Sequence, residues 1–419
     1  MTYSEAVAYI HSLLVFGMKP GLSRISALLS ELGDPQNDLK FVHVAGTNGK
    51  GTTSNMLSRI LVEAGYKTGL FTSPYVFSFC ERIQVNHQNI SESALAETVT
   101  IVRDAIERLN RRGIVPTEFE AITAAALLYF KNAGCDIAVM EVGLGGRFDS
   151  TNIIPCPEVC VITSISLDHT KVLGDTIAKI AFEKAGIIKE GGVTVTTNRQ
   201  EPDALQVIQN TAAEKHNRLV VADAISAEVQ SQKLGETVFT YDGREYTMPL
   251  TGLHQVENAV GAIETARCLA GVTQENIVNG IRKTVMHGRM EYLPGLPPVL
   301  LDGGHNPECG AALAAVLRDF APENVTAVIG MMEDKDTAHY LKAVTPYVKT
   351  IWFTKPENPR AAAPEVLKAQ TRDFSGKIFL EPNVPAAFEN AKRTTPKDGL
   401  VLVCGSFYLL SDLGLPTEN

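Results

Sequence analysis

The sequence predicts an α/β protein in which a largely parallel, doubly wound β-sheet is followed by a second and smaller α/β domain. Two observations lead to this prediction. Short apolar runs alternate along the chain with amphipathic helical stretches, which is the pattern of parallel strands connected by helices on both faces of a sheet. In addition, 419 residues exceed what one ordinary hydrophobic core encloses, so two or three domains are expected.

The first domain is expected to cover residues 1–292. The expected strands are 41–45, 137–142, 159–163 and 193–196, and the expected helices are 118–131, 176–188 and 202–216. Residues 239–248 instead alternate between apolar and polar side chains and contain the pair Asp242-Gly243, which is a β-hairpin signal. We therefore expect a small antiparallel excursion within residues 228–249 on this domain.

The second domain is expected to cover residues 297–419. Residues 292–298 contain three prolines and one glycine, which makes this segment the best candidate for a linker. Beyond it the alternation of strands and helices restarts, and this length suffices for a Rossmann-like α/β domain. The expected strands are 299–302, 325–330, 350–353, 378–380 and 400–404.

The composition is typical of a globular protein that handles small molecules. Hydrophobic residues make up 45% of the chain and charged residues 20%, which excludes a disordered chain. A net charge of −9 without a basic, aromatic-rich stripe argues against nucleic-acid binding. No apolar run approaches the ~20 residues of a membrane span, and the N-terminus lacks a signal-peptide pattern. The seven scattered cysteines indicate free thiols, so we expect a cytoplasmic protein without membrane partners.

The most informative motif is a glycine-rich segment, residues 46–53, which we call the phosphate loop. It reads Gly-Thr-Asn-Gly-Lys-Gly-Thr-Thr and lies between the strand 41–45 and a helix-like stretch. Backbone N–H groups and the helix dipole at such a turn favour bound phosphates. Lys50 is expected to supply a cation for the terminal phosphates, and Thr52 or Thr53 a hydroxyl for magnesium. The alternative is a glycine-rich turn that binds no nucleotide. The predicted ATP-binding residues of the loop are Gly46, Thr47, Asn48, Gly49, Lys50, Gly51, Thr52 and Thr53.

A carboxylate, Glu141, stands at the end of the expected strand 137–142 and is followed by a glycine-rich turn. Ligands of doubly wound sheets bind beyond the carboxyl ends of the strands. A carboxylate buried there is costly unless it is paired or bound to a metal, and magnesium prefers hard oxygen ligands together with phosphate oxygens. We therefore expect Glu141 to bind magnesium. The alternative is a carboxylate held by the amides of its own turn.

These motifs resemble the Mur ligase superfamily and, within it, the folylpolyglutamate synthase/dihydrofolate synthase family. The phosphate loop of that family reads G-T-N-G-K-G-S, and Thr52 here stands in place of the serine. The block Glu-Val-Gly-Leu-Gly-Gly-Arg-Phe-Asp-Ser-Thr-Asn at 141–152 and the string Gly-Gly-His-Asn-Pro at 303–307 are similar to family blocks. The similarity runs in the same order along almost the whole chain.

The resemblance implies two magnesium ions beside ATP. Ser73, in a Ser-Pro motif, and His169, in a Leu-Asp-His motif, match metal-binding residues of the family. Lys184 matches a lysine that carbon dioxide converts to a carbamate, which would turn a cation into an anionic oxygen donor. By sequence alone His169 is equally a structural histidine and Lys184 an ordinary helix lysine. The implied metal-binding set is Thr52, Ser73, Glu141, His169 and Lys184.

The resemblance also implies contacts to the other substrates. Asn258 matches a residue that reaches the adenine, Asp302 one that binds the ribose, and Arg289 one that contacts phosphates. His305 and Ser406 match residues near the transferred phosphate and the incoming glutamate. Arg82, Phe119 and Asp149 are assigned to the pterin or folate site, where Phe119 could equally be a core aromatic. The implied catalytic residues are Lys50, Lys184, His305 and Ser406.

The implied activity is an ATP-dependent, ADP-forming acid–amino-acid ligase of folate metabolism, acting as a monomer. It would add L-glutamate to dihydropteroate and to reduced folates through an acyl phosphate. The blocks at 117–120 and 141–152 resemble bifunctional bacterial enzymes, so we expect both reactions, with a monofunctional folylpolyglutamate synthase as the alternative. A cell-wall Mur ligase is disfavoured, since only about 40 residues precede the phosphate loop. A P-loop kinase or NTPase would leave the 303–307 string unexplained.

Overall fold

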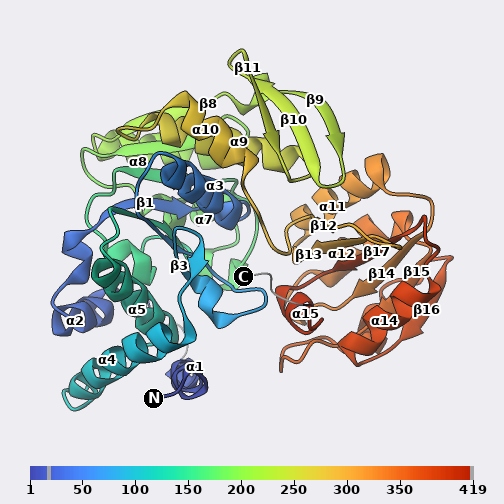
Figure 1. Ribbon diagram of the computed structural model, residues 1–419, viewed down its shortest axis with the longest axis horizontal. Coiled ribbons are helices and arrows are strands. Elements are labelled where there is room, and N and C mark those ends of the chain that lie inside the picture. Colours follow the sequence, from blue (N-terminus) through green and yellow to red (C-terminus); the bar gives the residue numbers. More distant parts are fainter. Residues whose placement is uncertain (17–19, 416–419) are drawn as a thin grey trace. The chain divides into compact units, whose positions relative to one another are not determined.

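A computed structural model describes residues 1–16 and 20–415 (Figure 1). Its contacts divide the chain into two compact units, each with its own sheet. Unit 1 comprises residues 1–73, 79–227 and 257–284, and unit 2 comprises residues 74–78, 228–256 and 285–419.

Unit 1 is built on a mostly parallel sheet, which has eight strands within the described residues. Their order is β4-β3-β2-β5-β1-β6-β7-β8. The parallel strands are β2 (Thr68–Phe71), β5 (Ile137–Glu141), β1 (Lys40–Ala45), β6 (Val159–Ile162), β7 (Val193–Thr197) and β8 (Arg218–Ala222). The short strands β3 (Ile83–Val85) and β4 (Gln88–Asn89) extend it in antiparallel fashion. The four predicted strands of the first domain are confirmed. Strands β2 and β8 were not predicted, because β2 is short and contains a glycine and β8 is a half-exposed edge strand.

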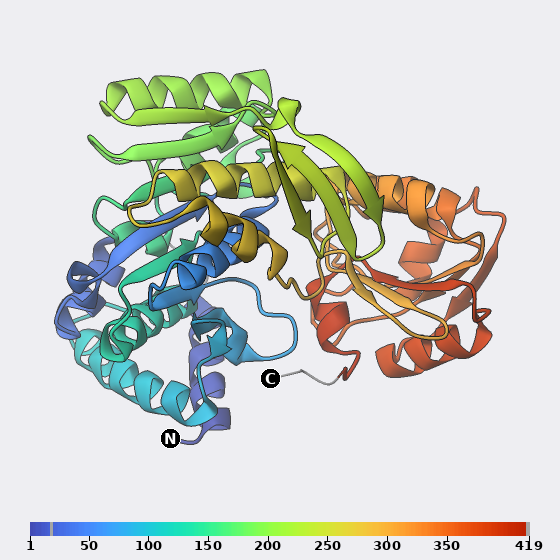
Figure 2. The ribbon, with the colours of Figure 1, turned by 45° about the horizontal axis from the view of Figure 1, so that its top comes forward.

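Helices cover this sheet, and several begin at a side-chain cap. Thr117 and Thr2 form capping boxes at the starts of α5 and α1, and Ser91 and Thr176 accept from the first turns of α4 and α7. Helices α3 and α10 pack together, as do α7 and α8, and Figure 2 shows α8 along the β8 edge. The helices are α1 (Tyr3–Ser12), α2 (Ser23–Glu31), α3 (Lys50–Glu63), α4 (Glu92–Asn110), α5 (Glu118–Ala133), α6 (Thr170–Leu173), α7 (Ile177–Ala185), α8 (Pro202–Glu214) and α10 (Gln274–Arg282). Helix α9 (Leu253–Arg267) crosses from unit 2 into unit 1.

The predicted hairpin is confirmed and belongs to an antiparallel sheet of β9 (Glu228–Lys233), β10 (Glu236–Tyr241) and β11 (Arg244–Met248). Asp242 and Gly243 connect β10 to β11 with φ of +53° and +68°, as a tight hairpin turn requires. The contacts group this sheet with unit 2, whereas the sequence suggested an excursion on the first domain.

Unit 2 contains, over its described residues, a six-stranded sheet in the order β12-β13-β17-β14-β15-β16. All its pairs are parallel except β12 with β13. The strands are β12 (Glu291–Leu293), β13 (Val299–Asp302), β14 (Val325–Ile329), β15 (Thr350–Phe353), β16 (Lys377–Leu380) and β17 (Leu400–Cys404). The five predicted strands of the second domain are confirmed. The proline-rich segment predicted as a linker contributes to β12 and to the turn between β12 and β13.

Alternating side chains of these strands enter two hydrophobic cores, one on each face. Leu300 packs in the core that includes residues of α11 (Pro307–Phe320) and α12 (Thr337–Val344). Leu301, the next residue, packs in the other core with residues of α14 (Val384–Thr394) and α15 (Phe407–Ser411). Helices therefore cover both faces of this sheet (Figure 1), as in a doubly wound fold. Helix α13 (Pro364–Ala369) follows β15. All seven cysteines are free thiols, and no helix within the described ranges is long and apolar enough to cross a membrane.

Candidate active site

The phosphate loop connects β1 to α3 in unit 1, and two of its glycines are sterically required. Gly46 and Gly49 have φ of +150° and +83°, a region that favours glycine. A side chain at Gly46 would collide with the hydroxyl of Thr163, and one at Gly49 with the amide of Asn258. Because Gly49 is the N-cap of α3 and has no side chain, the first turn of this helix receives no side-chain cap from it. The loop thus has the local geometry of an anion-binding helix N-terminus.

Two lysine side chains converge on the main chain of this loop. The Lys50 Nζ donates hydrogen bonds of 3.0 Å to the carbonyl oxygens of Gly46 and Thr47. The Lys184 Nζ, on α7, donates a 2.7 Å hydrogen bond to the same Gly46 oxygen. Lys184 is 4% exposed, so a residue that looks like an ordinary helix lysine in the sequence is buried beside the phosphate loop.

Burial makes Lys184 chemically unusual. It lowers the pKa of the Lys184 amine well below its ordinary value, and repulsion from Lys50 lowers this pKa further, against the opposing carboxylates of Asp168 and Asp149. Burial of a lysine favours its neutral amine, which is the nucleophilic form, over the ammonium.

Glu141 ends β5 at the carboxyl edge of the sheet and is 3% exposed. Its Oε2 accepts a 2.9 Å hydrogen bond from the backbone N–H of Ser73. A Cβ built on Gly51 would lie 3.6 Å from both carboxylate oxygens, so Glu141 faces the first turn of α3. Thr52, in that turn, is also buried. The structure therefore brings together the predicted positions Glu141, Ser73 and Thr52, which come from three different strand exits.

The Leu-Asp-His motif follows β6 and lies on the same edge. The negative charge of Asp168 opposes the lowering of the Lys184 pKa. His169 is the N-cap of α6, with φ of +50°, and 43% of its side chain is exposed. Among residues 1–16 and 20–415, no three His, Cys, Asp or Glu side chains lie close enough to hold a metal ion by themselves. A cation here would therefore take further ligands from other groups, such as hydroxyls or bound phosphate.

In unit 2, polar side chains follow the neighbouring strands β13 and β17. Asp302 is buried, and its carboxylate accepts from the N–H groups of Met290 and Gly304 at 3.1 and 3.0 Å. Burial raises the pKa of this carboxyl group, and the positive charge of Arg289 opposes the shift. The Arg289 guanidinium lies 4.3 Å from the ring centre of Phe407. Ser406 caps α15 by accepting from Tyr408 N–H at 3.1 Å. His305 is half-buried in the turn before α11.

The residues assigned to the pterin lie in unit 1. Phe119, in the first turn of α5, is half-buried, packs 5.9 Å from Phe71 between ring centres, and leaves no room for a side chain at Gly143. It thus adjoins the turn that follows Glu141. The Arg82 guanidinium lies 5.4 Å from the Phe79 ring centre.

Asp149 has a local role that the sequence did not indicate. Its Oδ1 accepts from the N–H and hydroxyl of Thr151 at 2.9 and 2.6 Å, and its Oδ2 accepts from Leu144 N–H at 2.9 Å. Burial raises the pKa of this carboxyl group, and these hydrogen bonds oppose the shift. The carboxylate organises the 143–152 loop itself, and contact with a pterin stays a prediction.

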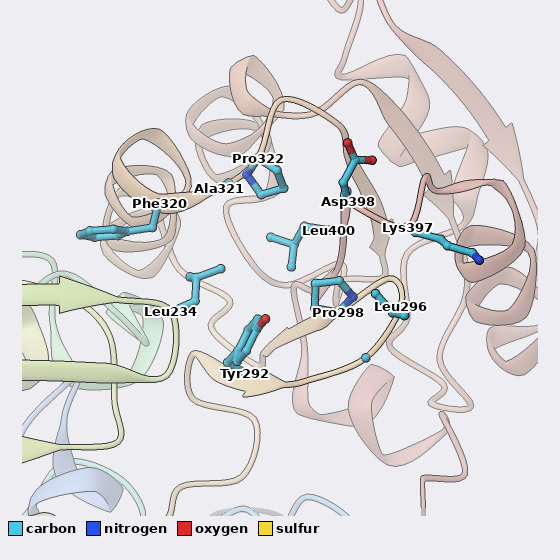
Figure 3. Close-up of a pocket in the computed structure, with 12 residues that line it drawn as sticks. Leu234, Tyr292, Leu296, Pro298, Phe320, Ala321, Pro322, Lys397, Asp398 and Leu400 are labelled. Atoms are coloured by element: carbon cyan, nitrogen blue, oxygen red, sulfur yellow. The ribbon is translucent and has the colours of Figure 1, made fainter.

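A pocket of about 470 Å³ in unit 2 lies away from Asp302 and Ser406 of the same unit. Figure 3 shows Tyr292, Pro298, Phe320 and Leu400 among its lining side chains. Pro298 and Leu400 precede or begin β13 and β17, whereas Asp302 and Ser406 follow the same strands. The pocket therefore lies at the amino-terminal ends of these strands, whereas Asp302 and Ser406 lie at the carboxyl ends.

Comparisons with known proteins agree with this arrangement. Residues 44–266 match the Mur ligase middle domain, and residues 288–407 match the Mur ligase glutamate ligase domain. The chain is 38% identical to the dihydrofolate synthase/folylpolyglutamate synthase of Bacillus subtilis, with 98% of each chain covered. It is 36% identical to the folylpolyglutamate synthase of Lacticaseibacillus casei, with 98% and 97% covered.

A solved structure gives the same relationship at the level of the fold. The folylpolyglutamate synthase of Mycobacterium tuberculosis, complexed with ADP and AMPPCP, matches with a TM-score of 0.90 at 29% identity, over 99% of this chain and 100% of that one. With its phosphate loop, its buried Lys184 and Glu141 and its two matching domains, this chain belongs to the folylpolyglutamate synthase/dihydrofolate synthase family of Mur ligases.

Proposed function

We propose that the protein is an ATP-dependent ligase that joins L-glutamate to dihydropteroate and, in a second activity, to the γ-carboxylate of reduced folates. The observation that carries this proposal is the convergence of the phosphate loop, Lys184 and Glu141 at one sheet edge, in a chain with a glutamate ligase domain. The name of the Bacillus subtilis relative, which covers both activities, supports the bifunctional form.

The reaction follows from the chemistry of carboxylates. A substrate carboxylate attacks the γ-phosphorus of ATP, which forms an acyl phosphate and releases ADP. The amine of glutamate then attacks the acyl carbon, loses a proton, and phosphate leaves as the amide forms. Lys50 and the N–H groups of α3 would stabilise the charge that develops on the phosphoryl group. We assign the adenine to Asn258, the ribose to Asp302, the phosphates to Arg289, and the incoming glutamate to His305 and Ser406.

The residues at the sheet edge fit magnesium bound together with ATP. Glu141 offers a buried carboxylate that accepts from Ser73 N–H and faces Gly51, the neighbour of Thr52. We assign the hydroxyls of Thr52 and Ser73 to the same ions. His169 and a modified Lys184 would complete the donor set for two ions. Bound magnesium would supply positive charge to the phosphate oxygens. The site needs such charge, because Glu141 and ATP are both anionic.

We further propose that Lys184 carries a carbamate. A neutral amine adds to carbon dioxide and releases one proton, and the lowered pKa of Lys184 makes the neutral amine available. With ¹³C-labelled carbon dioxide, we expect a protein-bound carbamate resonance in the carbon NMR spectrum. The signal should grow as the pH rises, since protonated amine does not react.

The matched control is Lys184→Met, which has the same length and cannot react. The carbamate assignment fails if wild type and Lys184→Met give the same spectrum at pH 8. An unmodified Lys184 in its protonated form would leave two cationic side chains against the phosphate loop.

The proposed function is tested by incubating the protein with ATP, magnesium and dihydropteroate, with and without L-glutamate. We expect ADP release only with glutamate, and a product that carries one added glutamyl residue in its mass spectrum. Tetrahydrofolate is assayed in parallel. Equal ADP release without glutamate would indicate an NTPase, and turnover of tetrahydrofolate alone would indicate a monofunctional folylpolyglutamate synthase.

Phe119 tests the proposed pterin site. Loss of an aromatic that stacks on a heterocycle typically costs ~10-fold or more in binding, so Phe119→Leu should lower kcat/KM for dihydropteroate by about that factor. We expect a smaller loss with tetrahydrofolate, whose reacting carboxylate lies further from the ring. Phe119→Tyr keeps the ring and serves as the control. Equal losses with both substrates would make Phe119 a core aromatic.

A further inference from the structure

Gln200 is a buried amide at the carboxyl edge of the unit 1 sheet, outside every motif discussed above. It lies between β7 and α8 and is 7% exposed. Its Nε2 donates to the carbonyl oxygen of Thr163 at 2.7 Å and to the hydroxyl of Thr196 at 3.0 Å, and its Oε1 accepts from Ile165 N–H at 3.1 Å. The amide thus satisfies the main chain on both sides of Ser164, just beyond the end of β6 at Ile162.

The segment that Gln200 holds is in turn bonded to the phosphate loop. Thr47 N–H donates to Ser164 O at 2.8 Å, and Ser166 N–H donates to the Thr47 hydroxyl at 3.1 Å. The Thr163 hydroxyl donates to Asn48 O at 2.7 Å. Residues 163–166 therefore form a support that contacts Thr47 and Asn48 but belongs to neither the loop nor its helix.

This support determines where a key N–H group of the loop points. In a planar trans peptide the carbonyl oxygen and the next N–H point in opposite directions. Since the Thr163 hydroxyl holds the Asn48 carbonyl, the N–H of Gly49 is directed away from β6. Gly49 N–H is the first donor at the N-terminus of α3, where a phosphate would bind.

We propose that Gln200 is a positioning residue for nucleotide binding, which acts on the phosphate loop through Thr163 and the 163–166 segment. The proposal rests on the proposed function, because it takes the nucleotide to be the ligand of this loop. Without the Gln200 amide, Thr163 O and Ile165 N–H are left buried without this partner, and the support can shift. Small displacements of positioning groups have large effects on binding and turnover.

The experiment compares Gln200→Met, which keeps the length and removes the polar atoms, with Asn217→Leu. Asn217 is also buried, and its amide donates to Lys189 O at 2.8 Å. It directly precedes β8 and therefore lies at the amino-terminal ends of the strands of the same sheet. We expect Gln200→Met to raise the Kd of magnesium-ADP by calorimetry and the KM for ATP by about ten-fold. KM for glutamate should stay within about two-fold in both variants. Asn217→Leu should lower the melting temperature comparably but keep the wild-type Kd.

A second pair of variants keeps the proposal testable if Gln200→Met does not fold. Thr163→Val removes the hydroxyl that holds Asn48 O and should weaken ADP binding, whereas Thr163→Ser should restore it. An unchanged Kd in Gln200→Met or in Thr163→Val, or equal weakening in Asn217→Leu, would overturn the proposal. Failure of the proposed function looks different, because wild type itself would then bind no ADP or would release ADP equally with and without glutamate.

Discussion

Replacing Lys50 by methionine is expected to lower ligase turnover by at least ~10²-fold while the protein stays folded, because a preorganised charge at a developing anion contributes about 3 kcal/mol or more. The Lys50 ammonium already lies at the phosphate loop, 3.0 Å from two of its carbonyl oxygens. The Gly46 carbonyl keeps its bond from Lys184 and Thr47 is half-buried, so we expect little change in melting temperature. Turnover within about three-fold of wild type would contradict the assignment of the phosphate loop.

Lys50→Met has a second consequence, which a purely structural lysine would not have. Lys50 lowers the pKa of Lys184 by repulsion. Without it, the pKa of the Lys184 amine should rise, and the carbamate resonance should appear only at higher pH. Lys50→Arg keeps the charge and should therefore leave the pH dependence of that resonance close to wild type. The two readouts separate loss of charge from loss of fold.

Replacing Glu141 by glutamine is expected to abolish most turnover, by at least ~10²-fold, because it removes the negative charge that the proposed magnesium ions require. The glutamine oxygen can still accept from Ser73 N–H, so the local hydrogen bond survives. Removal of a buried charge should leave the melting temperature of the ligand-free protein unchanged or higher. Magnesium should no longer tighten ADP binding in calorimetry.

Glu120 offers the matched control, since it is also a buried glutamate of unit 1. It accepts from Thr117 in the capping box of α5 and pairs with Arg24 at 3.1 Å. Glu120→Gln should therefore lower the melting temperature and keep turnover near wild type. If Glu141→Gln behaved in the same way, Glu141 would be a structural residue and the metal assignment would be lost.

The sequence alone predicted the alternation of strands and helices along the chain, apart from strands such as β2 and β8, and much of the local geometry of the site. Apolar runs such as 137–142 and 400–404 are buried strands because their side chains leave no polar face for water. The phosphate loop was predictable because its function depends on consecutive residues: glycines at positive φ and a helix N-terminus directly after them. Glu141 was predictable as a buried carboxylate because it ends an apolar strand, and burial of the strand implies burial of its end.

Only the tertiary structure decided which distant residues act on that loop. Lys184 and Gln200 carry no local signal. Lys184 reaches the phosphate loop, and Gln200 reaches the 163–166 segment beside it, only because β1, β6 and β7 are neighbours in the sheet. Asp149 likewise proved to hold its own loop through hydrogen bonds that no pattern announces. The spacing of apolar residues along a helix or strand indicates which side chains are buried, because the hydrophobic effect drives the apolar face of the element into the core. It does not report the hydrogen-bond partner or the shifted pKa of a buried polar group, because both depend on residues brought together by strand order.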